Sequence, residues 1–286
     1  MKLVDSIAAL RAQVTQWKAK GLRVALVPTM GNLHRGHLAL VAEACERADK
    51  VVATIFVNPT QFGEGEDFDG YPRTLAADAE RLESTGCDLL FVPTTAEMYP
   101  FGQQDLTRVQ VPQITNDHCG ASRPGHFDGV STVVNILFNL VQPDVACFGT
   151  KDYQQLAVLK RMARDLCIPV EIVGVPTVRE NDGLAKSSRN QYLTESERQI
   201  APRMYQILQA VQQELTENRE RSGYTFRVVE AQALQKLADA GFEPEYLTIC
   251  YRDDLEPAKD TERLLVVLIA ARLGKARLID NLEITL

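Results

Sequence analysis

The sequence predicts an α/β protein with a doubly wound parallel sheet, followed by a smaller α+β domain. Over the first 178 residues, short apolar runs alternate with helical stretches. Runs of this kind are typical of parallel strands that are buried on both faces. From about residue 182 the alternation stops, and helical stretches are followed by three strand-like segments. We therefore expect domains at 1–178 and 179–286, with ligands bound beyond the carboxyl ends of the parallel strands.

The first domain is expected to contain five strands, each preceded or followed by a helix. A helix is predicted at 6–20, because apolar residues recur there at steps of three and four and Gly21 follows as a stop. Apolar, β-rich runs predict strands at 24–27, 51–57, 89–92, 145–148 and 170–178. The remaining helices are predicted at 38–48, 75–82, 130–140 and 156–166.

The second domain is expected to begin with helices. Thr194 and Glu197 form a capping box that starts a helical stretch extending to about residue 215, and another helix is predicted at 226–240. Strands are then predicted at 246–251, 264–272 and 276–279, the last two joined by a tight hairpin at 273–275. Local pairing without a parallel crossover is typical of a small α+β domain.

The composition argues against polyanionic and membrane partners. The 286 residues include 31 Lys and Arg against 38 Asp and Glu, a formal net charge of -7. Proteins that bind nucleic acid generally carry a basic domain or stripe, so we expect no nucleic-acid partner. The longest apolar run, 264–271, is too short to cross a bilayer, and the N-terminus lacks a signal-peptide pattern. We therefore expect a cytoplasmic protein with no membrane contact.

The segment PTMGNLHRGH at 28–37 is the most informative motif, because it follows the first buried strand and opens the next helix. Backbone N–H groups at a helix N-terminus attract phosphate. His34 and His37 add imidazole donors, and Gly36 allows close backbone approach. Alternatively, the histidines cap the helix or ligate zinc, although no third ligand is obviously placed. The context after a buried strand favours phosphate chemistry.

Two common phosphate-binding motifs are absent from the sequence. There is no G-x-x-x-x-G-K-[ST] segment and no G-x-G-x-x-G segment after the first strand, so neither a P-loop nor a nicotinamide enzyme is expected. Nucleotidyl transfer remains, in which a nucleophile attacks the α-phosphate of a nucleoside triphosphate and pyrophosphate leaves. Fixed cations and N–H donors lower the barrier of such a step, because charge grows on the leaving oxygens.

Two further segments carry donors suited to a triphosphate. The segment FGTKD at 148–152 follows the fourth strand and starts a helix, which places Lys151 near the same edge of the sheet. The loop KSSRN at 186–190 combines two hydroxyls with two cations and suits a mobile phosphate clamp. Each segment alone would be interpreted as a solvated loop. Together with the histidine pair, they favour a phosphate site.

An acid to be activated needs a pocket of its own. Gln61 lies in the segment NPTQF at 58–62, where the second strand ends, and Gln154 and Gln155 lie one turn beyond Lys151. Glutamine hydrogen-bonds hydroxyl and carboxylate groups without adding charge. The loop RPGHFDG at 123–129 adds a cation and a histidine. The alternatives are a helix surface for the glutamines and a plain connection for the loop.

Taken together, these segments resemble the pantothenate synthetase (pantoate–β-alanine ligase) family of the nucleotidyltransferase superfamily. The resemblance extends over nearly the whole chain. It includes PTMGNLHRGH at 28–37, FVNPTQF at 56–62, YPRT at 71–74, RPGHFDGV at 123–130, FGTKDYQQL at 148–156 and GVPTVRENDGLAKSSRN at 174–190. It implies a Rossmann-like domain of the HxGH type, a C-terminal domain that closes over ATP, and a cytosolic homodimer.

The resemblance also implies a ligase reaction in two steps. The carboxylate of (R)-pantoate attacks the α-phosphate of Mg-ATP, giving pantoyl adenylate and pyrophosphate. The amine of β-alanine then displaces AMP to form the amide bond of pantothenate. No covalent enzyme nucleophile is needed, which agrees with the absence of a serine or cysteine triad signature.

The same resemblance implies roles for individual residues. The catalytic residues would be His37, usually assigned as proton donor, with His34, Lys151 and Arg189. The ATP site would comprise Met30, Gly31, His34, Gly36, His37, Gly149, Thr150, Lys151, Asp152, Val178, Lys186, Ser187, Ser188 and Arg189. Pantoate would contact Gln61, Gln155, Asn58, Tyr71, Arg123 and His126, and β-alanine would contact Gln61. Mg²⁺ would bind through the ATP phosphates, with Asp152 as a contributor directly or through water.

Two positions depart from the family pattern. Lys186 stands where Met or Leu is common, and Thr150 stands where Glu is common. We expect Lys186 to contact phosphate through its side chain or solvent. Two other functions remain open from the sequence: a different nucleotidyltransferase of the same superfamily, and a nonenzymatic nucleotide-binding regulator that has kept the fold.

Overall fold

The computed structural model describes residues 1–217 and 224–286 and divides the chain into two units. The first unit comprises Met1–Thr150 and Val158–Pro176, and the second comprises Lys151–Ala157 and Thr177–Leu286. The expected boundary at 178/179 lies close to the crossing at Pro176/Thr177. The segment 151–157, which the sequence pattern placed in the first domain, groups with the second unit. One reason is that the Lys151 carbonyl accepts a hydrogen bond from Asn281.

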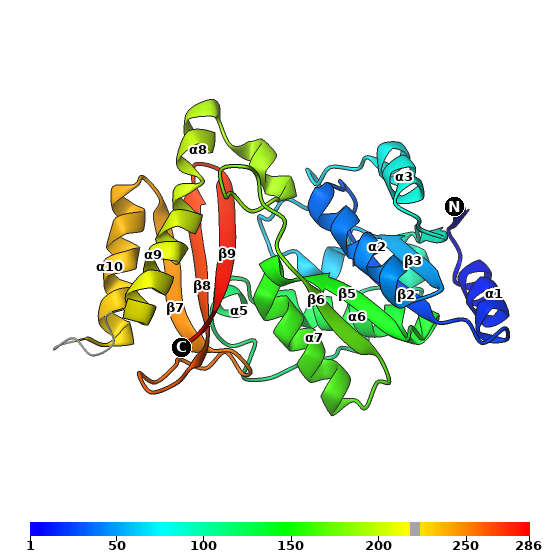
Figure 1. Cartoon of the computed structure of the whole chain (residues 1–286). Helices are drawn as coiled ribbons and strands as arrows, with labels where there is room; N and C mark the ends of the chain where they lie inside the picture. The colour runs from blue at the N-terminus through cyan, green and yellow to red at the C-terminus, as the bar shows by residue number, and fades with distance from the viewer. Residues whose placement is uncertain (218–223) are drawn as a thin grey trace. The chain divides into compact units, whose positions relative to one another are not determined.

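The first unit contains a six-stranded parallel sheet in the order β1-β4-β3-β2-β5-β6 (Figure 1). Its strands are β1 (Lys2–Val4), β2 (Val24–Thr29), β3 (Lys50–Ile55), β4 (Leu89–Phe91), β5 (Val145–Gly149) and β6 (Glu171–Val175). The five predicted strands are confirmed. The first of the six was not predicted, because it has only three residues at the edge of the sheet and buries only Val4. Strand β6 ends before Pro176, which has no backbone N–H to continue the ladder.

Helices cover both faces of this sheet. Helix α2 contacts β2, β3 and β5, whereas α1 and α6 contact each other and β2. The core beneath α2 includes Ala25 and Val27, so the alternate residues of β2, also fully buried, point to the opposite face. The helices are α1 (Ile7–Lys18), α2 (Arg35–Arg47), α3 (Leu75–Ser84), α4 (Thr95–Met98), α5 (Cys119–Ser122), α6 (His126–Val141) and α7 (Tyr153–Asp165). The expectation of a doubly wound parallel α/β fold is confirmed.

One predicted loop is shorter than expected. The sequence indicated a connection at 123–129, but α6 already begins at His126. The loop ends at Gly125, whose φ of +78° lies in the left-handed region that glycine adopts without strain. The interpretation of residues 126–129 as loop is therefore wrong, and His126 and Gly129 are held on a helix.

The strand order reverses between β2 and β5. From β2 the chain proceeds outward through β3 to β4, and it later continues on the other side of β2 through β5 to β6. Parallel α/β sheets bind ligands beyond the carboxyl ends of the strands at such a reversal. The segments that follow β2 and β5 are those with the histidine pair and Gly149-Thr150-Lys151.

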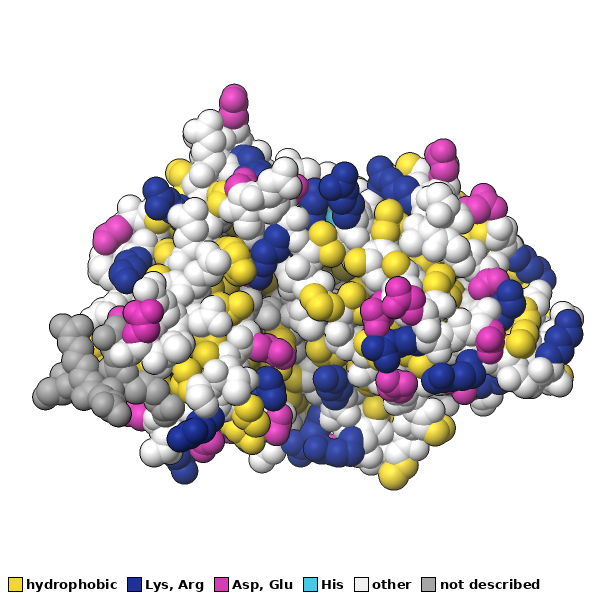
Figure 2. Space-filling model, viewed as in Figure 1, with side chains coloured by type: hydrophobic (Ala, Val, Ile, Leu, Met, Phe, Trp, Pro, Cys, Tyr) yellow, Lys and Arg dark blue, Asp and Glu magenta, His cyan; other side chains and the backbone are white. Residues whose placement is uncertain are grey.

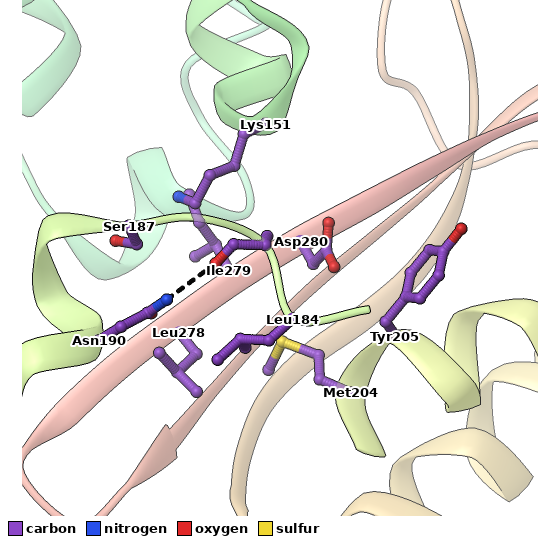
Figure 3. Close-up of a pocket in the computed structure, with 10 residues that line it drawn as sticks. Lys151, Leu184, Ser187, Asn190, Met204, Tyr205, Leu278, Ile279 and Asp280 are labelled. Atoms are coloured by element: carbon purple, nitrogen blue, oxygen red, sulfur yellow. Dashed lines mark hydrogen bonds between the residues drawn. The ribbon is translucent and has the colours of Figure 1, made fainter. Parts of the chain in front are cut away.

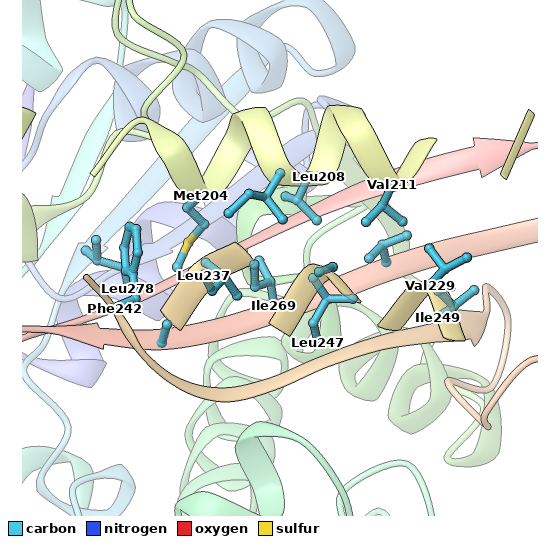
Figure 4. Close-up of a cluster of buried hydrophobic side chains, with 14 of the residues drawn as sticks. Met204, Leu208, Val211, Val229, Leu237, Phe242, Leu247, Ile249, Ile269 and Leu278 are labelled. Atoms are coloured by element: carbon cyan, nitrogen blue, oxygen red, sulfur yellow. The ribbon is translucent and has the colours of Figure 1, made fainter. Parts of the chain in front are cut away.

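The second unit has an antiparallel sheet in the order β7-β8-β9. Its elements are η3 (Ser188–Tyr192), α8 (Glu195–Ile200), α9 (Arg203–Glu217), α10 (Phe226–Asp239), β7 (Glu243–Tyr251), β8 (Leu264–Leu273) and β9 (Ala276–Thr285). The predicted hairpin is confirmed, although β9 is six residues longer than expected because it pairs along the whole of β8. Side chains of α9 and α10, such as Leu208 and Leu237, pack on the sheet in one core (Figure 4).

On the face of each unit that Figure 2 draws, charged side chains are not gathered by sign. Figure 2 shows Lys and Arg side chains interspersed with Asp and Glu over the visible face of each unit. Within the described ranges, no helix combines the length and the apolarity needed to cross a membrane.

Candidate active site

The turn between β2 and α2 is fixed by hydrogen bonds within the first unit. The Thr29 hydroxyl donates to the Thr54 carbonyl at 2.7 Å, and the Gly31 amide donates to the Thr29 oxygen at 3.2 Å. Gly31 has a φ of +83°, and a Cβ there would lie 3.1 Å from the Ile55 side chain. A glycine is therefore required where the chain leaves β2 for the histidine pair.

The two histidines cap the start of α2 with their side chains. The Gly36 amide donates to His34 Nδ1 at 3.1 Å, and the His34 amide donates to His37 Nδ1 at 3.3 Å. The ring centroids are 4.1 Å apart. Because Nδ1 accepts a hydrogen bond in both rings, each neutral imidazole carries its proton on Nε2. Both Nε2–H groups are therefore donors.

Because of this capping, backbone amides at the start of α2 donate to the histidine pair itself. The sequence pattern assigned phosphate attraction to backbone amides at the start of α2. The amides of Gly36, His37 and Leu38 all have intramolecular partners, since the last two donate to the His34 carbonyl. The structure therefore presents two imidazole Nε2–H donors at the start of α2, where the positive potential of the helix N-terminus also favours an anion.

Asn58, expected to contact pantoate, is only 1 % exposed. Its Oδ1 accepts from the Thr60 amide (3.2 Å), the Thr60 hydroxyl (2.9 Å) and the Tyr99 hydroxyl (2.7 Å). Its Nδ2 donates to Gln61 Oε1 at 3.0 Å and to the Gly129 carbonyl at 3.2 Å. The Thr60 amide can only donate and the Gly129 carbonyl can only accept, so Asn58 has a single amide orientation.

Gln61 is oriented by this network. Since its Oε1 already accepts from Asn58, its Nε2 supplies donors, and Nε2 lies 3.2 Å from Met30 Sδ. An amide nitrogen suits a carboxylate or hydroxyl oxygen of a ligand. The contact with Met30 also brings the Gln61 segment next to the β2–α2 turn.

Arg123, the residue after α5, and His126, the first residue of α6, support Gln61. The Arg123 guanidinium binds both carboxylate oxygens of Glu66 at 2.6 Å, and its Nη1 lies 2.9 Å from His126 Nε2. His126 Nδ1 lies 2.8 Å from the Gln61 carbonyl, which only accepts, so Nδ1 donates. Partial burial raises the pKa of Glu66, but the Arg123 hydrogen bonds and charge outweigh it and leave the pKa below its usual value.

Tyr71, the last of the expected pantoate residues in the first unit, is 5 % exposed. Its ring meets Phe62 edge to face, with the ring centroids 5.9 Å apart. Tyr71 therefore packs beside the segment that carries Gln61.

The second unit contains the other predicted site residues except Gly149 and Thr150, which lie at the end of the Met1–Thr150 segment of the first unit. Lys151 lies in η2 (Thr150–Asp152) with its Nζ 3.8 Å from the exposed Asp152, and Gln155 is half-buried in α7. The Lys186 amide donates to the Val178 carbonyl, and the Lys186 ammonium is paired with Glu180. Ser187 caps η3 by accepting from the Arg189 amide at 3.2 Å, and Ser188 is the first residue of that turn.

A small cavity within the second unit brings Lys151 and Ser187 together (Figure 3). Asn190 and Asp280 also line it. The Asn281 side chain donates to the Lys151 carbonyl at 2.8 Å, which fixes the backbone that carries the lysine.

The loop before Ser187 is anchored to β9. Arg179 binds Asp280 through two hydrogen bonds of 2.6 and 3.0 Å, and its guanidinium lies 3.6 Å from the centroid of the Tyr205 ring. A bidentate pair between a nearly buried carboxylate and a stacked guanidinium restricts the loop strongly.

Several residues with a clear structural role in these networks were not singled out by the sequence pattern. They are Glu66, Asp78, Tyr99, Asp280 and Asn281. Each acts on a residue distant in the sequence, so no local motif marks it. A charged residue inside an apolar periodic segment, as with Asp78 in α3, is the one available signal.

Few side chains among the described residues are placed to ligate a metal ion. No group of three or more His, Cys, Asp and Glu residues at 1–217 and 224–286 is arranged to hold a metal ion. Asp152 alone would add one carboxylate to a cation that is otherwise held by phosphate oxygens.

Comparison with known proteins finds similarity along the whole chain. The family model described as "Pantoate-beta-alanine ligase" matches residues 2–283. Pantothenate synthetases of Pseudomonas putida and Marinobacter nauticus are 56% and 52% identical, covering 100% of this chain and 98% and 100% of those proteins. The crystal structure of pantothenate synthetase from Thermus thermophilus matches with a TM-score of 0.92 and 48% identity, covering 100% of both chains. Pantoate-beta-alanine ligase from Francisella tularensis, complexed with beta-gamma ATP and beta-alanine, matches with a TM-score of 0.82 and 33% identity, covering 99% of this chain and 97% of that one.

Proposed function

Because the chain belongs to the pantoate–β-alanine ligase family, we propose that it joins (R)-pantoate to β-alanine through a pantoyl adenylate formed beside the β2–α2 turn. The protein is an ATP-dependent ligase that forms a C–N bond and releases AMP and pyrophosphate. The family match also extends over the C-terminal unit, which a different nucleotidyltransferase would not share.

The histidine pair carries the proposed mechanism of the first step. The pantoate carboxylate oxygen bonds to the α-phosphorus, the bond to the β-phosphate oxygen breaks, and pyrophosphate takes the electron pair. The Nδ1 atoms of His34 and His37 accept hydrogen bonds from backbone amides, so Nε2–H of each ring is the proposed donor to phosphate oxygens. Donors held in place before charge develops are worth about 2.7–4 kcal/mol each in comparable sites.

Cations of the second unit are proposed to neutralise the triphosphate. Lys151 and Arg189 act as catalytic residues together with the histidines. The proposed ATP contacts are Met30, Gly31, His34, Gly36, His37, Gly149, Thr150, Lys151, Asp152, Val178, Lys186, Ser187, Ser188 and Arg189. Pairing of Lys151 with Asp152 at 3.8 Å is loose, so the lysine exchanges this partner for phosphate at small cost.

Gln61 is proposed as the principal contact for pantoate. Its Nε2 donors suit the carboxylate and hydroxyl oxygens of that acid, and Gln155 supplies a second amide. Asn58, Tyr71, Arg123 and His126 contribute mainly by holding Gln61 and its segment. In the second step the β-alanine amine, placed by Gln61, attacks the acyl carbon, loses a proton, and expels AMP.

Three further properties rest on the family resemblance. We propose that Mg²⁺ enters with ATP as part of the substrate and that Asp152 contributes to its shell. We also propose that the chain acts as a homodimer and that it works in the cytoplasm.

Isotope exchange between pyrophosphate and ATP tests the mechanism. The exchange should require pantoate and should not require β-alanine, because only the adenylation step is read. Replacing His37 or Lys151 by alanine should slow the exchange by ~2–4 kcal/mol in activation free energy. Exchange that is indifferent to pantoate would refute the adenylate, and a wild-type rate in either variant would remove that residue from the catalytic set.

A further inference from the structure

The buried carboxylate of Asp78 accepts hydrogen bonds from the backbone of the β2–α2 turn. Asp78, in α3, has no exposed surface. Burying a carboxylate is costly unless it is paired and hydrogen-bonded. The Asn32 amide donates to Asp78 Oδ2 and the Leu33 amide to Oδ1, both at 2.8 Å, and the Thr74 hydroxyl donates to Oδ2 at 2.9 Å. The Arg81 guanidinium lies 3.8 Å from Oδ1.

Two successive amides of this turn donate to one carboxylate. Gly31 and Asn32 have φ values of +83° and +51°. The amides of Asn32 and Leu33 that follow each donate to a different oxygen of Asp78. The amides of Asn32 and Leu33 are therefore committed to the protein's own anion.

The same support continues into the histidine pair. Arg81 donates to the Leu33 carbonyl, so both the amide and the carbonyl of Leu33 are held from α3. Leu33 directly precedes His34, whose amide in turn donates to His37 Nδ1. The position of Leu33 therefore determines the direction in which His34 enters α2 and the geometry of both rings.

We propose that Asp78 is the positioning residue of the histidine pair: it locks the turn so that the Nε2–H groups of His34 and His37 are fixed before ATP binds. This inference rests on the proposed role of the histidines in adenylation. Asp78 touches no substrate. Its effect reaches the reaction through the backbone of Asn32 and Leu33.

The principal test is Asp78→Asn. Asparagine keeps the size of the side chain but offers one acceptor and one donor, so one of the two amides loses its partner and faces an N–H₂ group. Turnover in pantoate-dependent pyrophosphate exchange should fall about 10- to 100-fold, as expected for a displacement of the order of 1 Å. The KM for pantoate should stay near the wild-type value.

Glu230→Gln is the matched control. Glu230 is also a buried carboxylate, 6 % exposed, that accepts from the Ile249 amide at 2.7 Å and from Arg227 at 2.9 Å. This variant should lose thermal stability as Asp78→Asn does but keep wild-type turnover per folded molecule. An equal loss of turnover in both variants would overturn the positioning role.

A spectroscopic measurement separates positioning from general stability. The chain has only four histidines, so nitrogen-15 spectra of the rings are tractable in the full-length protein. His34 and His37 should show the Nε2–H form in the wild type, and Asp78→Asn should shift these two signals and not that of His126. Wild-type turnover with unshifted ring signals would refute the inference.

Arg81→Ala keeps the test open if Asp78→Asn fails to fold. Arg81 is half exposed, so its loss should cost little stability, but it removes the bond to the Leu33 carbonyl. Turnover should fall several-fold, with shifted signals of His34 and His37, and unchanged values would count against the proposal. His37→Ala is measured alongside. If His37→Ala exchanges pyrophosphate at the wild-type rate, the proposed function of the histidine pair is refuted. If His37→Ala is slow but the Asp78 and Arg81 variants keep wild-type turnover, only the positioning role is refuted.

Discussion

Gly129→Ala offers a quantitative test of how Gln61 is positioned. Gly129 lies in α6 and faces η1 (Pro59–Gln61). A Cβ at this position would lie 2.4 Å from the Thr60 carbonyl oxygen and 2.7 Å from Gln61 Cα. Ordinary contacts begin at 3.4 Å, and the atoms involved are backbone rather than the end of a flexible side chain. The segment that carries Gln61 must therefore move away by as much as about 1 Å.

The expected energies have opposite signs. On an open helix, alanine would stabilise the protein by about 1 kcal/mol relative to glycine. Overpacking against rigid backbone costs about 1–3 kcal/mol, so we expect a net loss of roughly 0–2 kcal/mol in the free energy of unfolding. A displacement of the order of 1 Å at a positioning residue costs up to about 10²-fold in efficiency. We expect the KM for pantoate to rise at least about 10-fold, while the KM for ATP stays near wild type.

Steady-state kinetics with each substrate varied in turn, together with thermal unfolding, would measure these effects. Gly70→Ala is the neutral control, because its Cβ would meet only the Asp67 carbonyl at 4.0 Å. Gly274→Ala is the destabilising control, because Gly274 has a φ of +54° and its Cβ would lie 1.9 Å from Glu197 Oε1, within the second unit. A wild-type KM for pantoate in Gly129→Ala would refute the reasoning. An equal rise in Gly274→Ala would show that lost stability, and not the position of Gln61, is measured.

Three further outcomes follow from the networks around the site. Tyr99→Phe removes one donor to Asn58 and should cost about 1 kcal/mol of stability, with a several-fold rise in the pantoate KM and none in the ATP KM; a proportional change in both constants would contradict the assigned amide orientation. Glu66→Gln should destabilise the protein at pH 7 by about 1.5–3 kcal/mol. Because the folded pKa of Glu66 lies below the usual 4.5, the carboxylate stabilises the fold above that value, and the difference between wild type and variant in denaturant melts should vanish as the pH falls through the folded pKa. Lys186→Met should raise the ATP KM about two- to five-fold, because the ion pair with Glu180 costs only about 0–1 kcal/mol to break and the wild-type lysine can then bind phosphate. Lower thermal stability with an unchanged ATP KM would show that Lys186 only stabilises its loop.

Local pattern was sufficient for most of the fold. The parallel strands from residue 24 onward could be predicted because strands buried on both faces appear in the sequence as apolar runs. The hairpin at 273–275 could be predicted because the residues that favour a tight turn are adjacent in the sequence. Strand β1 and the start of α6 were not predicted. The first is too short to give a period, and the second depends on Gly125, whose left-handed conformation no neighbouring residue indicates.

The candidate site divides in the same way. The sequence predicted site roles for His34, His37 and Gln61 because these residues lie in short, recognisable segments. The resemblance implied a pantoate contact for Arg123, and the structure adds the pairing of that guanidinium with Glu66, which the sequence did not indicate. Pairing of this kind joins residues 57 positions apart, and periodicity over ten or twenty residues carries no information about it.

The sequence alone determined the α/β class, the positions of most strands along the chain, and the residue types that suit phosphate and carboxylate. The tertiary structure decided how those residues are used. It placed the Asp78 carboxylate on the amides of the β2–α2 turn, directed both Nδ1 atoms to the backbone, and gave Asn58 a single orientation. The physical reason is that the direction of a hydrogen bond depends on donors and acceptors from distant segments. Only the folded chain brings these together.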